Sequence, residues 1–183
     1  DFCVETDWVV GQVLASLEKH QLAENTLIIF TADNGTSPQA KLDHLHANGH
    51  DHSNGLRGLK GSLYEAGHRV PFIVRWPKSV EAAKQTDAFI CTTDLMATVA
   101  EITGVELADN SAEDSVSFLP ALRGKTHDRG AIYWHFPHYS NHGYQSPGGA
   151  IRLGKYKLLE YYENGSVQLF DLEKDIGEQN DLS

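Results

Sequence analysis

The sequence feature that most constrains the fold is an apolar run that leads directly into polar residues, at 26–35. Residues 27–30 are all apolar, which is typical of a parallel strand buried on both faces. Asp33 then places a carboxylate at the carboxyl end of this strand, where open α/β sheets bind ligands. Asn34 adds an amide oxygen, and Gly35 allows a sharp turn. Because Ca²⁺ and Mg²⁺ prefer oxygen ligands, the stretch predicts a metal site at Asp33 and Asn34. The alternative is a plain turn, which the same residue types favour.

Composition narrows the possible partners. The chain has 183 residues, with 15 Lys and Arg against 25 Asp and Glu, so its formal net charge is −10. This excess of negative charge argues against nucleic acid or an anionic membrane as a partner, although a few local cations can still bind an anionic substrate. Cys3 and Cys91 are too few for a disulfide framework or a zinc site. No apolar run approaches the length of a transmembrane helix.

The hydrophobic pattern alternates between helices and strands at first and then changes to consecutive strands. It predicts an α/β fold: part of a mixed, mostly parallel sheet flanked by helices, followed by a small antiparallel β subdomain. A hairpin signal, Asn164-Gly165, supports the antiparallel part. The predicted helices span 5–20 (capped by Thr6 or Asp7), Thr92 or Thr93 to Thr103, and part of 117–123; the predicted strands span 26–32, 69–77, 131–134, 150–153, 156–162 and 167–172.

Two basic side chains are candidates for contact with an anionic substrate. Lys60 lies between Gly58 and Gly61, ahead of a helical or turn segment predicted at 62–64, and the glycines allow close approach of a ligand. An ammonium group suits one oxygen of a sulfate or phosphate. The alternative is a surface lysine in a glycine-rich loop. His68, at the entrance of the second predicted strand, either contacts substrate or hydrogen-bonds a backbone carbonyl.

Two further stretches carry residue types found at binding sites. Residues 36–56 read as a polar loop with four histidines at spacings that can chelate zinc or copper, but no cysteine or clear carboxylate completes a set, which favours a solvated loop. Residues 131–148 combine aromatic and polar groups that suit contact with sugars, and a plain surface loop is equally compatible. The histidines of the first stretch are His44, His46, His50 and His52; the polar and aromatic residues of the second are His135, His138, Tyr139, Asn141 and His142.

Taken in order, these segments resemble the C-terminal portion of a type I sulfatase of the alkaline-phosphatase superfamily, and the resemblance covers essentially the whole chain. Any one segment is weak evidence, but several in order at family-like spacing are specific. The segments are 28–35, 56–71, 93–100, 154–159 and 169–172. The resemblance implies that residues 1–125 are the C-terminal half of a catalytic α/β domain and residues 126–183 a small antiparallel subdomain.

The resemblance also implies roles for individual residues. Asp33 and Asn34 would be two ligands of one divalent cation, usually Ca²⁺, with Mg²⁺ possible. Lys60 would hold a sulfate oxygen and stabilise charge on the leaving side. Independently of these implied roles, we expect His68 to bind substrate. The segment 65–67 reads Glu-Ala-Gly where many relatives have Glu-Gly-Gly, a small change that we expect to leave the chemistry intact.

Other parts of the family pattern are missing from these residues. The family's nucleophile is a formylglycine made from Cys or Ser in a Cys/Ser-x-Pro-x-Arg motif, and the sequence contains no such motif. The aspartate pair that completes the metal site is also missing, as are the upstream lysine and histidines. We expect these groups to precede Asp1 in a longer parent protein, and the present chain alone to be inactive.

The resemblance favours a sulfated carbohydrate over an aryl sulfate ester as substrate, and it suggests a periplasmic or secreted parent protein. Two alternatives belong to different functional classes. One is a phosphodiester or phosphonate hydrolase of the same superfamily, which shares the metal-bearing strand. The other is a non-catalytic remnant that binds sulfated glycans.

Overall fold

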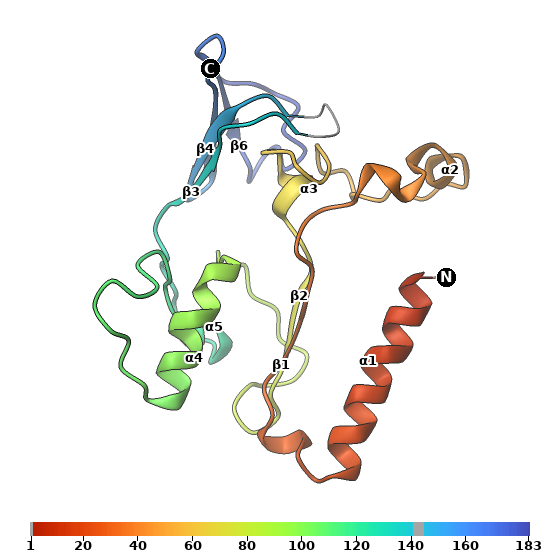
Figure 1. Ribbon diagram of the computed structural model, residues 1–183, viewed down its shortest axis with the longest axis vertical. Coiled ribbons are helices and arrows are strands. Elements are labelled where there is room, and N and C mark those ends of the chain that lie inside the picture. Colours follow the sequence, from red (N-terminus) through yellow and green to blue (C-terminus); the bar gives the residue numbers. More distant parts are fainter. Residues whose placement is uncertain (1, 141–144) are drawn as a thin grey trace. The chain divides into compact units, whose positions relative to one another are not determined.

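A computed structural model of the chain describes residues 2–140 and 145–183 (Figure 1). It divides into two compact units, each built from two stretches of sequence. Unit 1 comprises Asp1–Phe30 and Ile73–Arg129, and unit 2 comprises Thr31–Phe72 and Gly130–Ser183. The predicted sugar contacts Asn141 and His142 lie outside the described residues. The predicted domain boundary at residue 125 stays a prediction.

Unit 1 holds the long helices of the fold. Strands β1 and β2 form a two-stranded sheet, and the chain passes from one unit to the other within these strands. Helix α4 ends where the sequence predicts, because Gly104 adopts the left-handed conformation that closes a helix (φ 70°). The elements are α1 (Phe2–Lys19), η1 (Ala23–Asn25), β1 (Ile28–Thr31), β2 (Phe72–Arg75), η3 (Thr92–Asp94), α4 (Leu95–Thr103) and α5 (Leu119–Leu122).

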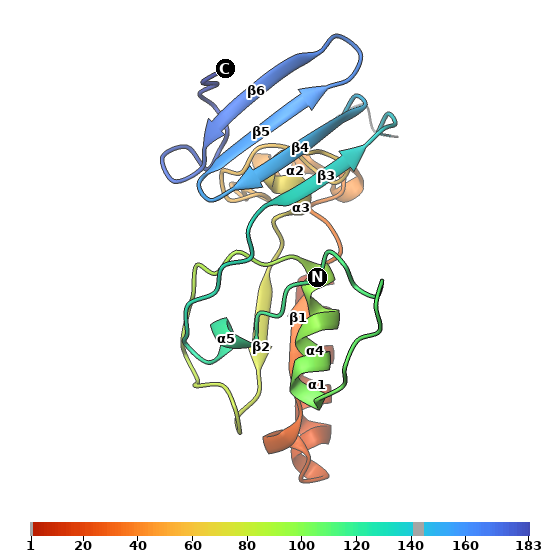
Figure 2. The same cartoon turned by 90° about the vertical axis from the view of Figure 1, so that its left-hand side faces the viewer.

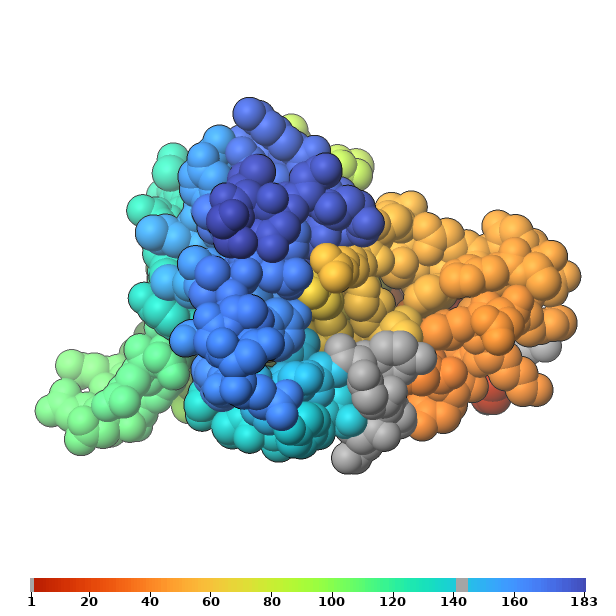
Figure 3. All heavy atoms as spheres, turned by 90° about the horizontal axis from the view of Figure 1, so that it is seen from above, coloured from red at the N-terminus to blue at the C-terminus, as the bar shows by residue number. Residues whose placement is uncertain are grey.

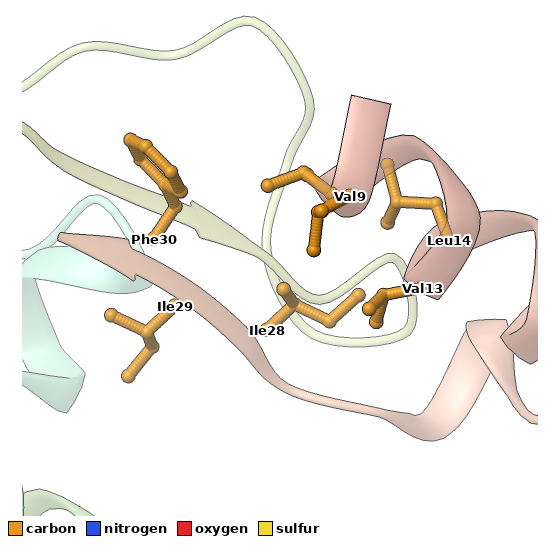
Figure 4. Close-up of a pocket in the computed structure, with 7 residues that line it drawn as sticks. Val9, Val13, Leu14, Ile28, Ile29 and Phe30 are labelled. Atoms are coloured by element: carbon orange, nitrogen blue, oxygen red, sulfur yellow. The ribbon is translucent and has the colours of Figure 1, made fainter. Parts of the chain in front are cut away.

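Helix α1 differs from the prediction at its start and in its exposure. It begins at Phe2, so the predicted start at residue 5 with a cap at Thr6 or Asp7 is wrong; the Thr6 hydroxyl instead donates to the Phe2 carbonyl inside the helix (2.9 Å). No residue of α1 is buried. An open apolar pocket of about 190 Å³ lies between α1 and β1, as Figure 4 shows. Its lining residues are Val9, Val10, Val13, Leu14, Ile28, Ile29 and Phe30.

The expectation of strands buried on both faces is wrong for the described residues. No residue of β1 is fully buried, and Phe30 is 36% exposed. In β2, Ile73 is 61% exposed. The physical reason is that each strand pairs only with the other, so the two-stranded sheet covers little of its own apolar surface.

Unit 2 contains an antiparallel sheet, which confirms the predicted C-terminal strands. Its order is β3-β4-β5-β6, as Figure 2 shows. Ala150 of β4 lies opposite Leu159 of β5, and these residues pack with Leu63, Phe170 and Leu172 in the hydrophobic core. The strands are β3 (Ile132–Phe136), β4 (Gly148–Leu153), β5 (Tyr156–Tyr161) and β6 (Ser166–Asp171).

The other stretch of unit 2 contains more helix than the sequence predicts. Residues 36–56 are not a simple loop, since they include η2 (Pro38–Ala40) and α2 (Leu42–Ala47). The helical turn predicted at 62–64 starts later, as α3 (Glu65–His68). The Glu178 side chain accepts a hydrogen bond from the backbone amide of Glu65 (2.6 Å), which joins α3 to the C-terminal segment. Figure 3 shows these yellow and blue segments side by side. No helix among the described residues is both long and apolar enough to span a membrane.

Candidate active site

The predicted metal ligands lie on the loop that follows β1. Asp33 is exposed and Asn34 is half-buried. The side-chain nitrogen of Asn34, Nδ2, donates a hydrogen bond to the backbone carbonyl of Gly35 (3.0 Å). Because this bond uses the nitrogen end of the amide, the amide oxygen of Asn34 is left to accept from, or ligate, another group.

A close backbone contact fixes this loop against α3. The amide of Gly35 donates to the carbonyl of Gly67 (3.0 Å). A Cβ at Gly35 would lie 1.6 Å from the carbonyl oxygen of Ala66, so no other residue fits there without moving the backbone. Gly67 is restricted in the same way, since its Cβ would lie 2.0 Å from the carbonyl oxygen of Ser62. Glycine is therefore required on both sides of the contact.

A second backbone bond brings the Lys60 loop to the same place. The amide of Lys60 donates to the carbonyl of Thr36 (3.0 Å), two residues after Asn34. Gly58 and Gly61, on either side of Lys60, adopt positive φ angles of 94° and 79°, which only glycine adopts readily. Lys60 is half-buried, and its ammonium group forms no ion pair with any residue that the structure describes. An ammonium without an anionic partner can bind the oxygen of a sulfate or phosphate.

The donor chemistry at this loop fits part of a Ca²⁺ or Mg²⁺ site. Asp33 and Asn34 offer one carboxylate and one amide oxygen, the ligand types that these cations take. Ca²⁺ requires about six to eight oxygens. Within residues 2–140 and 145–183, no cluster of three or more His, Cys, Asp or Glu side chains could hold a metal ion. Asp33 and Asn34 alone therefore offer too few oxygens to fill a coordination shell.

The histidine-rich stretch brings together two of its four imidazoles. His46 Nε2 lies 3.1 Å from His52 Nδ1, and their ring centroids are 5.1 Å apart. His44 shares α2 with His46. Among the described residues, this pair is not part of a group of three or more His, Cys, Asp or Glu side chains that could hold a metal ion. The preference for a solvated segment over a dedicated zinc or copper site stays a prediction.

His68, the last residue of α3, points one ring nitrogen into the protein. Nε2 lies 3.2 Å from the carbonyl oxygen of Leu63 and 3.2 Å from Nζ of Lys157. The imidazole stacks on Trp134 with ring centroids 4.6 Å apart, and the side chain stays 22% exposed. Contact between His68 and substrate stays a prediction.

Beneath α3 lies a buried charge cluster that sequence reasoning missed. Lys157 on β5 is 0% exposed, and its Nζ lies 3.1 Å from Glu65 Oε1 and 2.8 Å from Glu178 Oε1. Arg69 and Arg152 pair with the other oxygen of Glu65 at 3.2 Å and 3.5 Å. The alternation of β5 contained the signal, because Lys157 shares the inward face with Leu159.

The cluster shifts the pKa values of its members in different directions. Burial opposes ionisation of Glu65, but Lys157 and His68 outweigh it and lower the pKa of that carboxyl. Burial raises the pKa of Glu178, and Lys157 offsets this only in part. Burial, followed by the positive charge of Lys157, lowers the pKa of His68 from 6.5 to about 4. His68 is therefore neutral at neutral pH.

Two family models match this chain. The model described as Sulfatase matches residues 1–105. The model described as N-sulphoglucosamine sulphohydrolase, C-terminal, matches residues 59–183. Together they span the whole chain, including the Asp33 loop, the Lys60 loop and the antiparallel sheet.

Curated relatives are similar over much or all of the chain. An N-acetylgalactosamine-6-O-sulfatase of Bacteroides thetaiotaomicron is 32% identical over 100% of this chain and 38% of its own length. A steryl-sulfatase of Rattus norvegicus is 38% identical over 74% of this chain and 24% of its own length. The chain thus spans less than two fifths of the length of these relatives.

Solved structures share the fold. One, from work on the metabolism of multiple glycosaminoglycans by Bacteroides thetaiotaomicron, has a TM-score of 0.80 at 32% identity and covers 97% of this chain and 39% of that chain. Another, in complex with its substrate D-glucosamine-2-N,6-O-disulfate, has a TM-score of 0.77 at 26% identity. The match covers 98% of this chain and 34% of that chain. A phosphonate monoester hydrolase from Silicibacter pomeroyi, with a TM-score of 0.69 at 22% identity, shares the fold alone and covers 96% and 34%. The family models, the relatives and the structures agree, and the chain belongs to the sulfatase family.

Proposed function

We propose that this chain supplies one side of the active site of a sulfuric ester hydrolase that removes sulfate from carbohydrates. The observation that carries the proposal is the pair of backbone hydrogen bonds that join the Asp33-Asn34 loop to α3 and to the Lys60 loop. These bonds bring the Asp33-Asn34 loop beside the Lys60 loop, which supports a shared role for their side-chain oxygens and for an ammonium group that forms no ion pair with the described residues. A cation and an ammonium are the groups that stabilise negative charge on a sulfate ester during hydrolysis.

Asp33 and the amide oxygen of Asn34 would hold a divalent cation, Ca²⁺ or Mg²⁺. Such a cation polarises the oxygens of the bound sulfate. Lys60 would hold a sulfate oxygen and stabilise charge that develops on the leaving side. The remaining metal ligands and the formylglycine nucleophile would come from residues outside these 183, because the sequence contains no Cys/Ser-x-Pro-x-Arg motif.

Sulfated sugars are the favoured substrate class because of what similar proteins act on or bind, and because of the side chains exposed in unit 2. A relative that matches the whole chain is an N-acetylgalactosamine-6-O-sulfatase, and a structural neighbour binds D-glucosamine-2-N,6-O-disulfate. Steryl-sulfatases match a smaller part of the chain. In unit 2, Tyr139 and His135 are exposed and carry ring and hydrogen-bonding groups that suit a sugar.

The test is sulfate release by the full-length protein that contains this chain. We expect turnover of sulfated N-acetylgalactosamine or glucosamine, slower turnover of an aryl sulfate, and loss of activity with a chelator that calcium restores. The 183-residue chain alone should release no sulfate, because it lacks a nucleophile for a covalent route. Sulfate release by the pure chain would contradict this account.

Turnover assays and calorimetry on the full-length protein separate the sulfatase from the two alternatives, a phosphonate hydrolase and a glycan-binding protein. Turnover of a phosphonate monoester with no sulfate release would favour the phosphonate hydrolase, whose structural likeness to this chain extends to the fold. Saturable binding of a sulfated glycan without turnover, measured by calorimetry on the full-length protein, would favour a binding role.

A further inference from the structure

The buried ammonium of Lys157 has three N–H donors to satisfy. Three groups surround it: Glu65 Oε1 at 3.1 Å and His68 Nε2 at 3.2 Å lie within hydrogen-bonding geometry, and Glu178 Oε1 forms an ion pair at 2.8 Å without a regular hydrogen bond. Lys157 is 0% exposed, so bulk solvent does not reach its ammonium group. If His68 Nε2 does not accept, the ammonium keeps one regular hydrogen bond, to Glu65, and the ion pair with Glu178.

His68 Nε2 has two neighbours that require opposite protonation. If Nε2 carried the proton, it would donate to the Leu63 carbonyl (3.2 Å), and Lys157 would face an N–H group instead of a lone pair. A buried ammonium donor would then remain unsatisfied. If Nε2 is unprotonated, Lys157 donates to it and only a carbonyl oxygen loses a partner. Buried carbonyls tolerate this better than buried charged donors do.

We infer that Lys157 holds His68 as the neutral imidazole with its proton on Nδ1, so that His68 presents a single N–H donor to an oxygen of bound substrate. The protonation state follows from the contacts of Lys157. The role toward substrate rests on the function proposed above. His68 would thus bind a sulfate or hydroxyl oxygen without exchanging a proton with it at neutral pH.

The surroundings of the imidazole support the neutral form. Glu65, on the same helix, lies 3.8 Å from Nε2, but its two oxygens also pair with Lys157, Arg69 and Arg152. Glu178 faces the cluster from the C-terminal segment and also pairs with Lys157. Trp134 covers one face of the ring. Burial and Lys157 lower the pKa of His68, in agreement with a ring that stays neutral.

Nδ1 is the nitrogen that remains for a ligand. No hydrogen bond joins Nδ1 to any residue in the part of the chain that the structure describes. A sulfate oxygen only accepts hydrogen bonds, so an unprotonated Nδ1 would repel it and a protonated Nδ1 would bind it. The tautomer therefore decides whether His68 helps or hinders an anionic substrate.

The first test is nitrogen-15 NMR of the histidine rings in the whole chain, with His68 assigned by the loss of its signals in H68Q. We expect an Nε2 shift typical of an unprotonated nitrogen and an Nδ1 shift typical of a protonated one, both unchanged as the pH falls from about 7.5 to 5.5. A protonated Nε2, or a ring that titrates near its ordinary pKa, would overturn the inference. This readout does not depend on sulfatase activity.

The role of Lys157 is tested by K157M/E178Q, which removes the ammonium and one opposing charge together. The His68 signals should move toward mixed tautomers, and unchanged signals would overturn the assignment to Lys157. If this variant does not fold, the measurement on the unmodified chain still decides the tautomer.

The role toward substrate is tested in the full-length protein with two amide substitutions, H68N and H68Q. The side chain of H68N can place its N–H near the position of Nδ1, whereas that of H68Q places it near Nε2. We expect KM for the sulfated sugar to rise at least about fivefold more in H68Q than in H68N, with a smaller change in kcat. Equal KM values would overturn the substrate role while leaving the tautomer result intact, and an inactive unmodified protein would instead count against the proposed function.

Discussion

At the scale of single residues, two glycines fix the candidate site. Gly35 and Gly67 meet across a backbone hydrogen bond of 3.0 Å, and neither position has room for a Cβ. The sequence predicts Gly35 as a turn residue, but the contact with α3 cannot be read from local sequence, because it joins positions 32 residues apart (67 − 35 = 32).

The substitution G35A should therefore destabilise the protein. Its Cβ would lie 1.6 Å from the Ala66 carbonyl oxygen, and relieving such a clash costs about 1–3 kcal/mol or more. The measurement is the free energy of unfolding in urea. Gly11, inside α1, is the matched control, because nothing lies within 4 Å of the place that its Cβ would take. G11A should be neutral or stabilising by about 1 kcal/mol or less. Equal effects of the two substitutions would contradict the close contact.

The depressed pKa of His68 predicts how stability depends on pH. The pKa falls from 6.5 when unfolded to about 4 when folded. Between these two pKa values the unfolded state binds more protons than the folded state does. The contribution of His68 to the free energy of unfolding is therefore fully present above about pH 6.5 and is lost as the pH falls toward 4. The full loss is roughly 3 kcal/mol. Urea unfolding at several pH values should show a steeper fall for the unmodified protein than for H68Q. Parallel curves would show that His68 titrates normally.

At the scale of elements, α3 is held by the charge cluster of β5 and the C-terminal segment. Removing one partner of a buried ion pair leaves the others uncompensated, which costs about 3–5 kcal/mol. K157M should destabilise by this amount in urea unfolding, since both Glu65 and Glu178 lose their shared partner. Lys84, whose pair with Glu81 is exposed on both sides (65% and 75%), is the control. K84M should cost about 0–1 kcal/mol, and a similar cost for both variants would argue against a structural role of the cluster.

The elements that were predicted correctly are those whose signals are local. The Asn164-Gly165 turn and the alternation of Tyr156–Tyr161 define the C-terminal hairpin, and Gly104 ends α4. The start of α1, the exposure of β1 and the buried position of Lys157 were not predicted. Burial depends on which elements pack together. A lysine in an alternating strand is expected to be solvent-exposed, and the carboxylates of Glu65 and Glu178 that pair with Lys157 come from distant parts of the sequence.

At the scale of the whole molecule, two features stand out among the described residues: an exposed apolar helix in unit 1 and an incomplete set of proposed metal ligands in unit 2. In unit 1, α1 buries none of its residues, and Trp8 is 63% exposed. In unit 2, the proposed ligands Asp33 and Asn34 would supply two oxygens to a cation that requires about six to eight. The chain spans 38% of the length of a relative that matches all of it. The proposed function therefore requires further metal ligands from outside these 183 residues.

Calcium binding should reflect this incompleteness. With two protein ligands, the 183-residue chain should bind Ca²⁺ no more tightly than about 10⁻⁴–10⁻³ M. Calorimetry measures this directly, and D33N should weaken the binding further. A micromolar dissociation constant, or one that D33N leaves unchanged, would show that the cation binds elsewhere.

We propose above that Lys60 and the Asp33-Asn34 loop act together on a sulfate ester. Steady-state sulfate release by the full-length protein, compared with its K60A variant, tests this most directly. We predict that the unmodified protein desulfates a sulfated hexosamine and that K60A lowers kcat/KM by about 100-fold or more, with unchanged urea unfolding. No sulfate release by the unmodified protein, or equal kcat/KM in both proteins, would contradict the account.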